Sequence, residues 1–260
     1  MNPLAPLHAA SELLILPNAW DAGSARLVEV AGAKAIATSS AAVAWAQGYP
    51  DGEALPFDAL LATLRAMARV VGVPLTADIE QAYGATPAAA AQNVGAVLEA
   101  GACGINIEDG SEAPELLCAK IAAIKARFGA RVWLNARTDV FLKSLVPAAQ
   151  GFEETVRRAM LYQGAGADSI FVPGAVEDDL LVRLVAAIDA PINLLAWPGL
   201  PDAARLKAIG IRRLSAGGGV AKASFDHAFV LARDFLRDGR SEPFTRPLNI
   251  PEGLNAQMKR

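Results

Sequence analysis

The chain has 260 residues, of which 53% are hydrophobic and 20% are charged, and its formal net charge is −3 at pH 7. This composition is typical of a globular protein, and the length suits one large α/β domain or two small ones with a core that needs no disulfide bonds. The slight acidity argues against a nucleic acid partner. The sequence contains no apolar stretch of about 18 residues, the length that a membrane-spanning helix needs. A small molecule is therefore the expected partner.

Two features of the sequence bear on the cellular compartment. Residues 1–10 lack the basic start and the long apolar core of a secretory signal. Cys103 and Cys118 have no metal-binding spacing and provide no framework of bridges, so we expect both to be buried small hydrophobic residues. A reducing cytoplasm is the simplest setting for such a chain.

Short apolar runs alternate with longer amphipathic stretches through most of the sequence. The amphipathic stretches have the apolar spacing of helices, for example over residues 57–71, 87–100 and 152–163. The short runs predict eight strands, at residues 13–16, 34–38, 74–77, 103–107, 131–135, 169–172, 191–195 and 211–215.

Eight strand–helix units in about 240 residues predict an α/β fold in which parallel strands close into a (β/α)8 TIM barrel. An open doubly wound sheet is the alternative, and it requires a Gly-x-Gly-x-x-Gly turn after the first strand. Here the first strand is followed by Pro17-Asn18-Ala19-Trp20-Asp21, which does not provide that turn. We therefore expect residues 1–240 to form a barrel domain that ends in a C-terminal helix near residues 220–236.

The end of the chain differs from the barrel in composition. Residues 241–260 contain three prolines and little periodicity, so we expect an extended arm rather than a second domain. The apolar residues Phe244, Leu248 and Ile250 of this arm would bury surface against the barrel or against a neighbouring subunit.

A run of three glycines, Gly217-Gly218-Gly219, follows the eighth expected strand. The favoured interpretation is a tight turn into the last helix. The alternative is a phosphate site at the start of that helix, where barrels often have one.

Acidic residues end two neighbouring expected strands. Asp78 and Glu80 follow the third strand and face the same way, because strand side chains alternate, and Glu108 ends the fourth strand. The carboxyl ends of barrel strands share one face, so these acids predict an oxygen-lined site for Mg²⁺, with Mn²⁺ as a second fit. Zinc is less favoured because the only histidines are His8 and His227. The alternative is that these acids only cap turns or helices.

Arg137 and a pair of serines add an expected anion site beside this acidic group. Arg137 either pairs with Glu108 or Asp139, or binds a substrate carboxylate in a bidentate manner, and both roles are compatible. Ser39-Ser40-Ala41, after the second strand, offers a hydroxyl and successive N–H groups suited to a carboxylate or phosphonate oxygen. A simple turn is the alternative for the serines.

Five ordered motifs lie at the expected strand ends. They are LPNAWDAGSAR at 16–26, ATSS at 37–40 with GYPD at 48–51, PLTADIEQAYG at 74–84, GINIED at 104–109 and NARTD at 135–139. In this order they resemble the isocitrate lyase/phosphoenolpyruvate mutase superfamily over nearly the full length of the chain. Members bind α-oxo- or α-hydroxycarboxylates on Mg²⁺ and cleave or form C–C or P–C bonds next to the carbonyl.

The resemblance implies a role for each acidic residue of the third and fourth strands. Asp78 would be the direct metal ligand, and Glu80 and Glu108 would hold the ion directly or through water. A metal that chelates an oxo group and a carboxylate stabilises the enolate left when the adjacent bond breaks.

The same resemblance implies the substrate contacts. Ser39, with the backbone N–H groups of Ser40 and Ala41, would bind the oxyanion end of the substrate, and Arg137 would bind a carboxylate. Asp51 would lie near the reacting bond, as a substrate-binding and catalytic residue.

Residues of two further motifs complete the expected site. Asn18 and Trp20 are expected to contact the substrate. Tyr83 or Asp51 is the best available proton carrier, because no histidine lies near a motif. Packing on the barrel rim is the alternative for Tyr83.

The sequence also departs from the resembling lyases. Only residues 110–114 separate Glu108-Asp109 from the next helix, so the long lid is missing, and Cys118 lacks the Gly-His flank of the lid cysteine. Phe171-Val172-Pro173-Gly174 and Leu195-Ala196-Trp197 replace the acidic and polar residues after the sixth and seventh strands. These departures argue against a true isocitrate or methylisocitrate lyase.

Three functions remain open from the sequence. The leading hypothesis is a Mg²⁺-dependent lyase or decarboxylase that acts on a small 2-oxo- or 2-hydroxy-dicarboxylate. The second is a phosphonopyruvate-type P–C bond hydrolase or mutase, and the third is a barrel that binds a dicarboxylate without turning it over. Because resembling proteins often exchange their last helix between neighbours, we also expect a homo-oligomer, a dimer or a tetramer.

Overall fold

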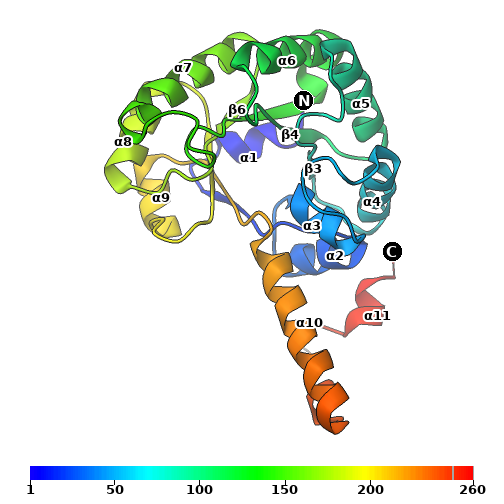
Figure 1. The fold of residues 1–260 in the computed structure, drawn as a ribbon. Helices are drawn as coiled ribbons and strands as arrows, with labels where there is room; N and C mark the ends of the chain where they lie inside the picture. Colours follow the sequence, from blue (N-terminus) through cyan, green and yellow to red (C-terminus); the bar gives the residue numbers. More distant parts are fainter. Residues whose placement is uncertain (248, 260) are drawn as a thin grey trace.

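The computed structural model describes residues 1–247 and 249–259, and it shows a ring of helices around a barrel of parallel strands (Figure 1). The strands are β1 (Leu14–Leu16), β2 (Ile36–Ala37), β3 (Leu75–Asp78), β4 (Gly104–Glu108), β5 (Trp133–Arg137), β6 (Ser169–Phe171), β7 (Ile192–Leu195) and β8 (Arg213–Ser215). The expected α/β (β/α)8 barrel is confirmed, and the ends of the eight strands differ from the predicted ones by at most two residues.

Helices alternate with the strands along the chain, and most of them cover the outside of the barrel. They are α1 (Ala5–Ala9), α2 (Ala22–Val30), α3 (Ser40–Ala46), α4 (Phe57–Val70), α5 (Pro87–Glu99), α6 (Pro114–Phe128), α7 (Gly151–Gly164), α8 (Asp178–Ala187), α9 (Ala203–Ile209), α10 (Gly219–Asp238) and α11 (Leu254–Gln257), with 3-10 turns at Gly129–Arg131, Ala148–Gln150 and Glu242–Phe244. Among the described residues, no helix has both the length and the apolar character that crossing a membrane requires.

Neighbouring strands pair in parallel in the order β1-β8-β7-β6-β5-β4-β3-β2. The ring closes between β1 and β2 through a single parallel bridge from Ala19 to Thr38. Asn18 strengthens this closure, because its side-chain amide donates to the carbonyl of Thr38 at 2.7 Å. The carboxyl ends of all eight strands therefore open on one face, which is where barrel sites are built.

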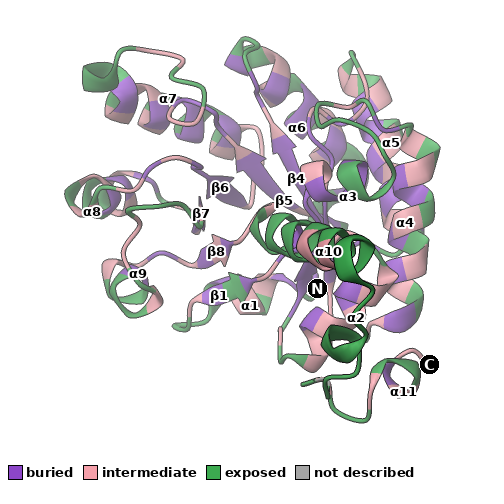
Figure 2. Ribbon diagram, turned by 60° about the horizontal axis from the view of Figure 1, so that its bottom comes forward, coloured by how far each residue is buried: buried purple, intermediate pink, exposed green. Residues whose placement is uncertain are grey.

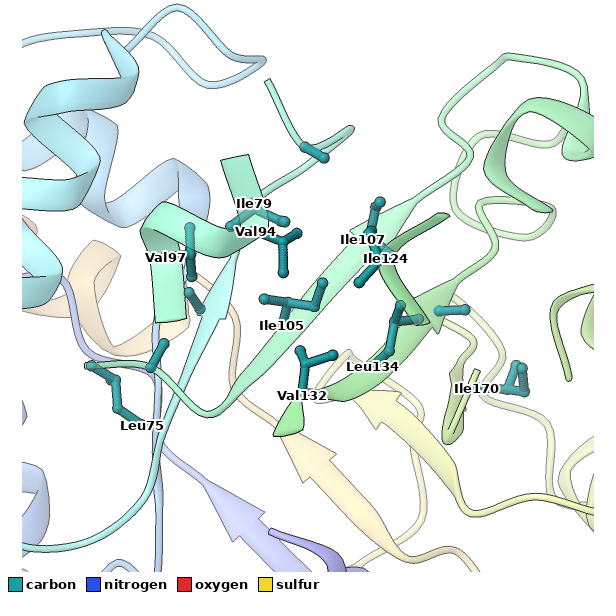
Figure 3. Packing of buried hydrophobic residues seen from close by; sticks show 14 of the residues in the cluster. Leu75, Ile79, Val94, Val97, Ile105, Ile107, Ile124, Val132, Leu134 and Ile170 are labelled. Carbon is teal, nitrogen blue, oxygen red and sulfur yellow. The ribbon is translucent and has the colours of Figure 1, made fainter. Parts of the chain in front are cut away.

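Successive side chains of a strand point alternately out of the barrel and into it, so an apolar outer layer is separated from a polar interior. In Figure 3, Ile105 and Ile107 of β4 lie beside Val94 and Val97 of α5 and Ile124 of α6, all fully buried. Each such side chain contributes about 1.5–3 kcal/mol through burial. The intervening strand positions, such as Asn106 and Glu108, face the inside of the barrel.

The N-terminal segment closes the end of the barrel opposite the strand carboxyl ends. The Asn2 side-chain amide donates to the carbonyl of Cys103, just before β4, at 2.6 Å. His8 on α1 is buried, with its ring stacked on Trp133 at a centroid distance of 4.4 Å. Its Nδ1 bonds the carbonyl of Leu4 at 2.9 Å, and its buried Nε2 has no hydrogen-bond partner.

Burial of His8 predicts a loss of stability in mild acid. Burial, together with the nearby Arg213 charge, lowers the pKa of His8 from 6.5 to about 4. Between these values the unfolded chain binds the extra proton, so the free energy of unfolding falls as the pH drops from about 6.5 to about 4. The expected loss is about 3 kcal/mol, measured by urea unfolding across this range.

A matched pair of variants isolates this effect. His8→Gln removes the titration and should flatten this part of the pH profile. His227→Gln changes an exposed histidine on α10 and should leave the profile as in the wild type. An unchanged profile in His8→Gln would refute the assignment.

The last helix, α10, leaves the barrel instead of covering it. Figure 1 shows α10 projecting away from the ring, and Figure 2 shows that most of its residues are exposed. Ile15, on the outer face of β1, is consequently 49% exposed, and Phe229 of α10 is 64% exposed.

Residues after α10 turn back towards the barrel. Phe244 packs edge-on against Phe235 of α10, with ring centroids 5.1 Å apart. Near the end of the chain, the Arg26 Nε on α2 donates to the carbonyl of Gln257 at 3.0 Å. Leu248, which the sequence analysis placed among the apolar residues of this arm, lies outside the described residues.

Candidate functional site

A pocket of about 330 Å³ opens at the carboxyl ends of the strands. This volume is near the lower limit of small-molecule sites, which span roughly 300–1,000 Å³. The lining residues are Asn18, Ser39, Ser40, Ala41, Trp45, Asp51, Asp78, Asn106, Arg137, Leu142, Phe171, Leu195, Trp197, Ser215, Gly217 and Gly218. Side chains from strands and loops far apart in the sequence thus share one cavity.

The pocket brings together most of the residues that the sequence analysis selected. Those that line it are Asn18, Ser39, Ser40, Ala41, Asp51, Asp78 and Arg137. Trp20 instead packs towards Phe225 of α10, with ring centroids 6.1 Å apart. Tyr83 packs on Phe57 at 5.2 Å and lines a separate cavity.

Asp78 is the last residue of β3, and its carboxylate lies against the start of α3. The Asp78 Oδ2 accepts hydrogen bonds from the Ser40 backbone N–H at 3.2 Å and from the Ser40 hydroxyl at 3.0 Å. The helix α3 was not predicted from the sequence. Ser39 is its N-cap, and the Ser39 hydroxyl accepts a hydrogen bond from the N–H of Ala42. Burial raises the pKa of Asp78, against the opposing effect of Arg137.

Glu80 follows two residues later, in a left-handed backbone conformation with φ of 51°. Its Oε2 accepts a hydrogen bond from the backbone N–H of Glu53 at 2.8 Å. Burial raises the pKa of Glu80 to about 7, and the charges of Asp78 and Asp51 act in the same direction. Glu80 is therefore a buried carboxyl that faces other carboxyls.

Arg137 and Glu108 are paired residues on neighbouring strands. They are directly opposite in the β4–β5 register, and Arg137 NH1 lies 2.6 Å from Glu108 Oε2. Burial raises the pKa of Glu108 to about 8 although Arg137 opposes the shift. The predicted ion pair of Arg137 is present, and the guanidinium also lines the pocket.

A buried network behind Arg137 fixes its orientation. The Arg137 Nε donates to Asp139 Oδ1 at 2.6 Å, and the backbone N–H of Asp139 donates to Asp109 Oδ1 at 2.9 Å. Asp109 Oδ2 accepts from Arg158 NH1 at 2.8 Å and from the Tyr162 hydroxyl at 2.5 Å. Arg158 and Tyr162 were not predicted from the sequence, because both lie on α7, outside the motifs at the strand ends.

Glu53 joins two loops at the rim of the pocket. Its Oε1 accepts hydrogen bonds from the backbone N–H groups of Gln81 at 3.0 Å and Tyr83 at 2.8 Å. The loop that carries Asp51 is thereby attached to the loop that follows β3. Glu53, Glu80 and Tyr83 all have positive φ, a conformation that such contacts must hold in place.

We predict that Glu53→Ala loosens this attachment. Removing the shared acceptor should lower the hydrogen-exchange protection of the Gln81 and Tyr83 amides by about tenfold, since each lost bond is worth about 1 kcal/mol. Glu53→Gln keeps the Oε1 acceptor and should retain most of the protection. Equal loss in both variants would show that this oxygen does not hold the loops together.

The three predicted metal ligands fit a hard cation in their chemistry. Asp78, Glu80 and Glu108 offer only oxygen donors, and burial raises the pKa of each, which a divalent cation would offset. Within residues 1–247 and 249–259, no three His, Cys, Asp or Glu side chains form a group that could hold a metal ion. Glu80 and Glu108 are instead directed to Glu53 and Arg137.

The connection after β4 is short, as the sequence indicated. β4 ends at Glu108 and α6 begins at Pro114, so residues 109–113 leave no room for a long lid. Cys118 lies within α6 and does not line the pocket.

The chain matches known proteins over nearly its full length. The model of the phosphoenolpyruvate phosphomutase family matches residues 4–236. An uncharacterised protein of Mycobacterium tuberculosis is 37% identical over 246 residues, which cover 93% of this chain and 91% of that protein. An oxaloacetate decarboxylase of Chromohalobacter salexigens is 28% identical over 255 residues, which cover 92% of this chain and 85% of that protein.

Solved structures also match this chain over nearly its full length. The structure of phosphonopyruvate hydrolase in complex with oxalate and Mg²⁺ superposes with a TM-score of 0.83 at 26% identity, over 96% of this chain and 93% of that one. Named relatives are thus enzymes that include decarboxylases and hydrolases of small organic acids. The family match runs from α1 to α10, across every strand end that lines the pocket. The chain therefore belongs to the phosphoenolpyruvate phosphomutase family, within the isocitrate lyase/phosphoenolpyruvate mutase superfamily that its motifs resemble.

Proposed function

We propose that this protein is a Mg²⁺-dependent lyase that breaks a C–C bond next to the carbonyl of a small 2-oxo- or 2-hydroxy-dicarboxylate. One observation carries the proposal: buried Asp78 and Arg137 line one pocket, and Glu80 and Glu108 lie close enough to Asp78 for its charge to raise their pKa values. One named relative, an oxaloacetate decarboxylase, and the oxalate and Mg²⁺ bound to the hydrolase support this chemistry.

The acids of β3 and β4 would hold the cation in this proposal. Asp78 lines the pocket and would be the direct ligand, while Glu80 and Glu108 would hold the ion directly or through water, because Mg²⁺ usually keeps several waters. Mn²⁺ fits the same oxygen donors. When bound, the cation would neutralise negative charge that develops on the substrate oxygen as the adjacent bond breaks.

The other pocket residues would bind the substrate and move its proton. Ser39 and the N–H of Ala41 lie at the start of α3, where anions are favoured, and Arg137 offers a carboxylate its guanidinium. Asp51 is the favoured proton carrier, because it lines the pocket whereas Tyr83 lines a separate cavity.

A parallel assay tests the proposal and its alternatives. Oxaloacetate, phosphonopyruvate and dimethylmalate are each incubated with the protein, with and without Mg²⁺. Metal-dependent C–C cleavage supports the lyase. Phosphate release from phosphonopyruvate would favour P–C hydrolysis, the activity of the superposed hydrolase. Tight oxalate binding without any turnover would instead indicate a binding protein.

We also propose that the protein is a homo-oligomer in which α10 packs on a second copy. Exposed aromatic residues on α10 and exposed Ile15 on β1 are apolar surfaces that a monomer leaves in water. Phe229→Asp should reduce the mass measured by light scattering, whereas Lys222→Gln, also exposed on α10, should not. A monomeric wild type in dilute solution would contradict this proposal.

A further inference from the structure

A chain of hydrogen bonds crosses the interior of the barrel and ends at Asn106, on the floor of the pocket. Trp133 Nε1 donates to Ser169 Oγ at 3.0 Å, and the Ser169 hydroxyl donates to Asn135 Oδ1 at 2.8 Å. The Asn135 amide then donates to Asn106 Oδ1, also at 2.8 Å. Ser169, Asn135 and Asn106 are all buried, and of these three only Asn106 lines the pocket.

The first group of this chain fixes the direction of every later hydrogen bond. An indole N–H only donates, so Ser169 Oγ accepts from Trp133 and uses its own proton for Asn135. That proton needs an acceptor, so the oxygen of the Asn135 amide faces Ser169 and its nitrogen faces Asn106. The oxygen of Asn106 is therefore turned inwards, and its NH₂ group is left for the pocket.

Arg213 holds the same amide from a second side. It is fully buried on β8, where its NH2 lies 3.4 Å from Asn106 Oδ1 and its Nε donates to Ser215 Oγ at 3.0 Å. A guanidinium has no acceptor, so this contact also requires the oxygen of Asn106 at that position. The orientation of the Asn106 amide thus has two independent anchors, Trp133 and Arg213.

A second asparagine of the barrel interior, Asn193, shows how the pocket sets Asn106 apart. Asn193 Oδ1 accepts from the Ser215 hydroxyl at 3.1 Å, so its oxygen also has a polar neighbour. The Asn193 Nδ2 is enclosed and has no partner among the described residues. The Asn106 Nδ2 likewise has no partner within the described part of the chain, but its residue lines the pocket, so a ligand can supply the acceptor.

Asn106 lies beside the residues that would hold the metal. In the registers of the sheet it is the direct partner of Asp78 on β3 and of Asn135 on β5. Its side chain shares the inner face of β4 with Glu108, two residues later. A donor at this place would meet a substrate oxygen next to the cation, where negative charge develops as the bond breaks.

We propose that Asn106 donates its amide N–H to a substrate oxygen, and that Trp133 and Arg213 are positioning residues that keep this amide turned to the pocket. This inference rests on the proposed function, because the cation must bring the substrate oxygen to the end of β4. The floor of the pocket then provides a neutral donor in addition to the guanidinium of Arg137.

A crystal structure of the full-length protein with Mg²⁺ and oxalate is the first test. Oxalate carries two adjacent carboxylates, which can chelate the cation as a 2-oxo acid does. One oxalate oxygen should lie about 2.7–3.2 Å from Asn106 Nδ2. A bound oxalate with no oxygen within about 3.5 Å of this atom would overturn the proposal.

Two changes outside the pocket lining test the positioning residues, with oxalate affinity measured by calorimetry at saturating Mg²⁺. Trp133→Phe keeps a ring to stack on His8 but removes the N–H that directs the chain. Arg213→Met removes the second donor to Asn106 Oδ1. Each alone should weaken oxalate binding by about twofold and the pair by about tenfold, because one anchor suffices to turn the amide.

Two further variants frame this result. Asn106→Ala removes the donor itself and should weaken oxalate binding about as much as the double variant. Arg212→Met, at a half-buried arginine that does not line the pocket, should leave the affinity unchanged. Residues with a purely structural role would lower the Tm without the non-additive loss of affinity.

The outcomes separate this inference from the proposed function. If oxalate binds with Mg²⁺ but lies away from Asn106, or the double variant binds it as tightly as the wild type, this inference is refuted and the proposed function stands. If oxalate shows no Mg²⁺-dependent binding, the proposed function fails and this inference fails with it.

Discussion

Asp78→Asn should lower Mg²⁺-dependent kcat/KM by at least about 1,000-fold and weaken Mg²⁺ binding by about 10–100-fold. The amide has nearly the same shape, and its oxygen still accepts a bond from Ser40, but it lacks the charge that the proposed cation needs. Steady-state kinetics and Mg²⁺ titration of the variant measure both effects.

The thermal stability of Asp78→Asn shows whether a loss of activity comes from lost chemistry or from a damaged fold. Burial raises the pKa of Asp78, so its charged form is unfavourable in the metal-free protein. The metal-free Asp78→Asn protein should therefore have a Tm equal to or above that of the wild type. Asp189→Asn, at an exposed position before β7, is the matched control for both readouts. Wild-type metal dependence in Asp78→Asn would reject the ligand assignment.

Arg137→Met should lower the free energy of unfolding by about 3–5 kcal/mol, because it leaves the buried Glu108 carboxylate without its cation and leaves buried Asp139 with only the more exposed Lys143. Glu108 and Asp139 each lie 2.6 Å from the guanidinium, and the side chain of Asp139 is fully buried. Arg137→Lys keeps the charge but cannot bond both acids with the same fork geometry, so we expect an intermediate loss. Urea unfolding measures the three proteins.

Two further variants test the cause of this loss. Glu108→Gln in the Arg137→Met background should restore part of the stability, because it removes one uncompensated charge. Arg157→Met removes a half-exposed arginine whose partners are Glu154 and Glu115, and it should cost less than about 1 kcal/mol. Equal losses in Arg137→Met and Arg157→Met would show that burial of the pair is unimportant.

Local periodicity was sufficient to predict the strands of the barrel. Apolar runs such as residues 103–107 became β4 because Ile105 and Ile107 face the helices, and this pattern is visible in the chain itself. The helix α3 was missed, because Ser40–Ala46 is a short alanine-rich segment without amphipathic spacing.

Some residues of the candidate site could likewise be predicted from the sequence, and others could not. Asp78, Arg137 and Asn18 were found because each ends a strand or follows it directly, and barrel strand ends meet on one face. Glu53 was not found, because its bonds to Gln81 and Tyr83 join loops about 30 residues apart and leave no local pattern.

The amino-acid sequence by itself determined the barrel, the family and the acids and arginine at the strand ends, because these depend on spacing along the chain. Only the tertiary structure decided which groups face one another: Glu80 with Glu53, Arg137 with Glu108, and Asp78 with Ser40. The physical reason is that pairing, burial and repulsion depend on distances across the barrel, and separation along the chain does not fix those distances.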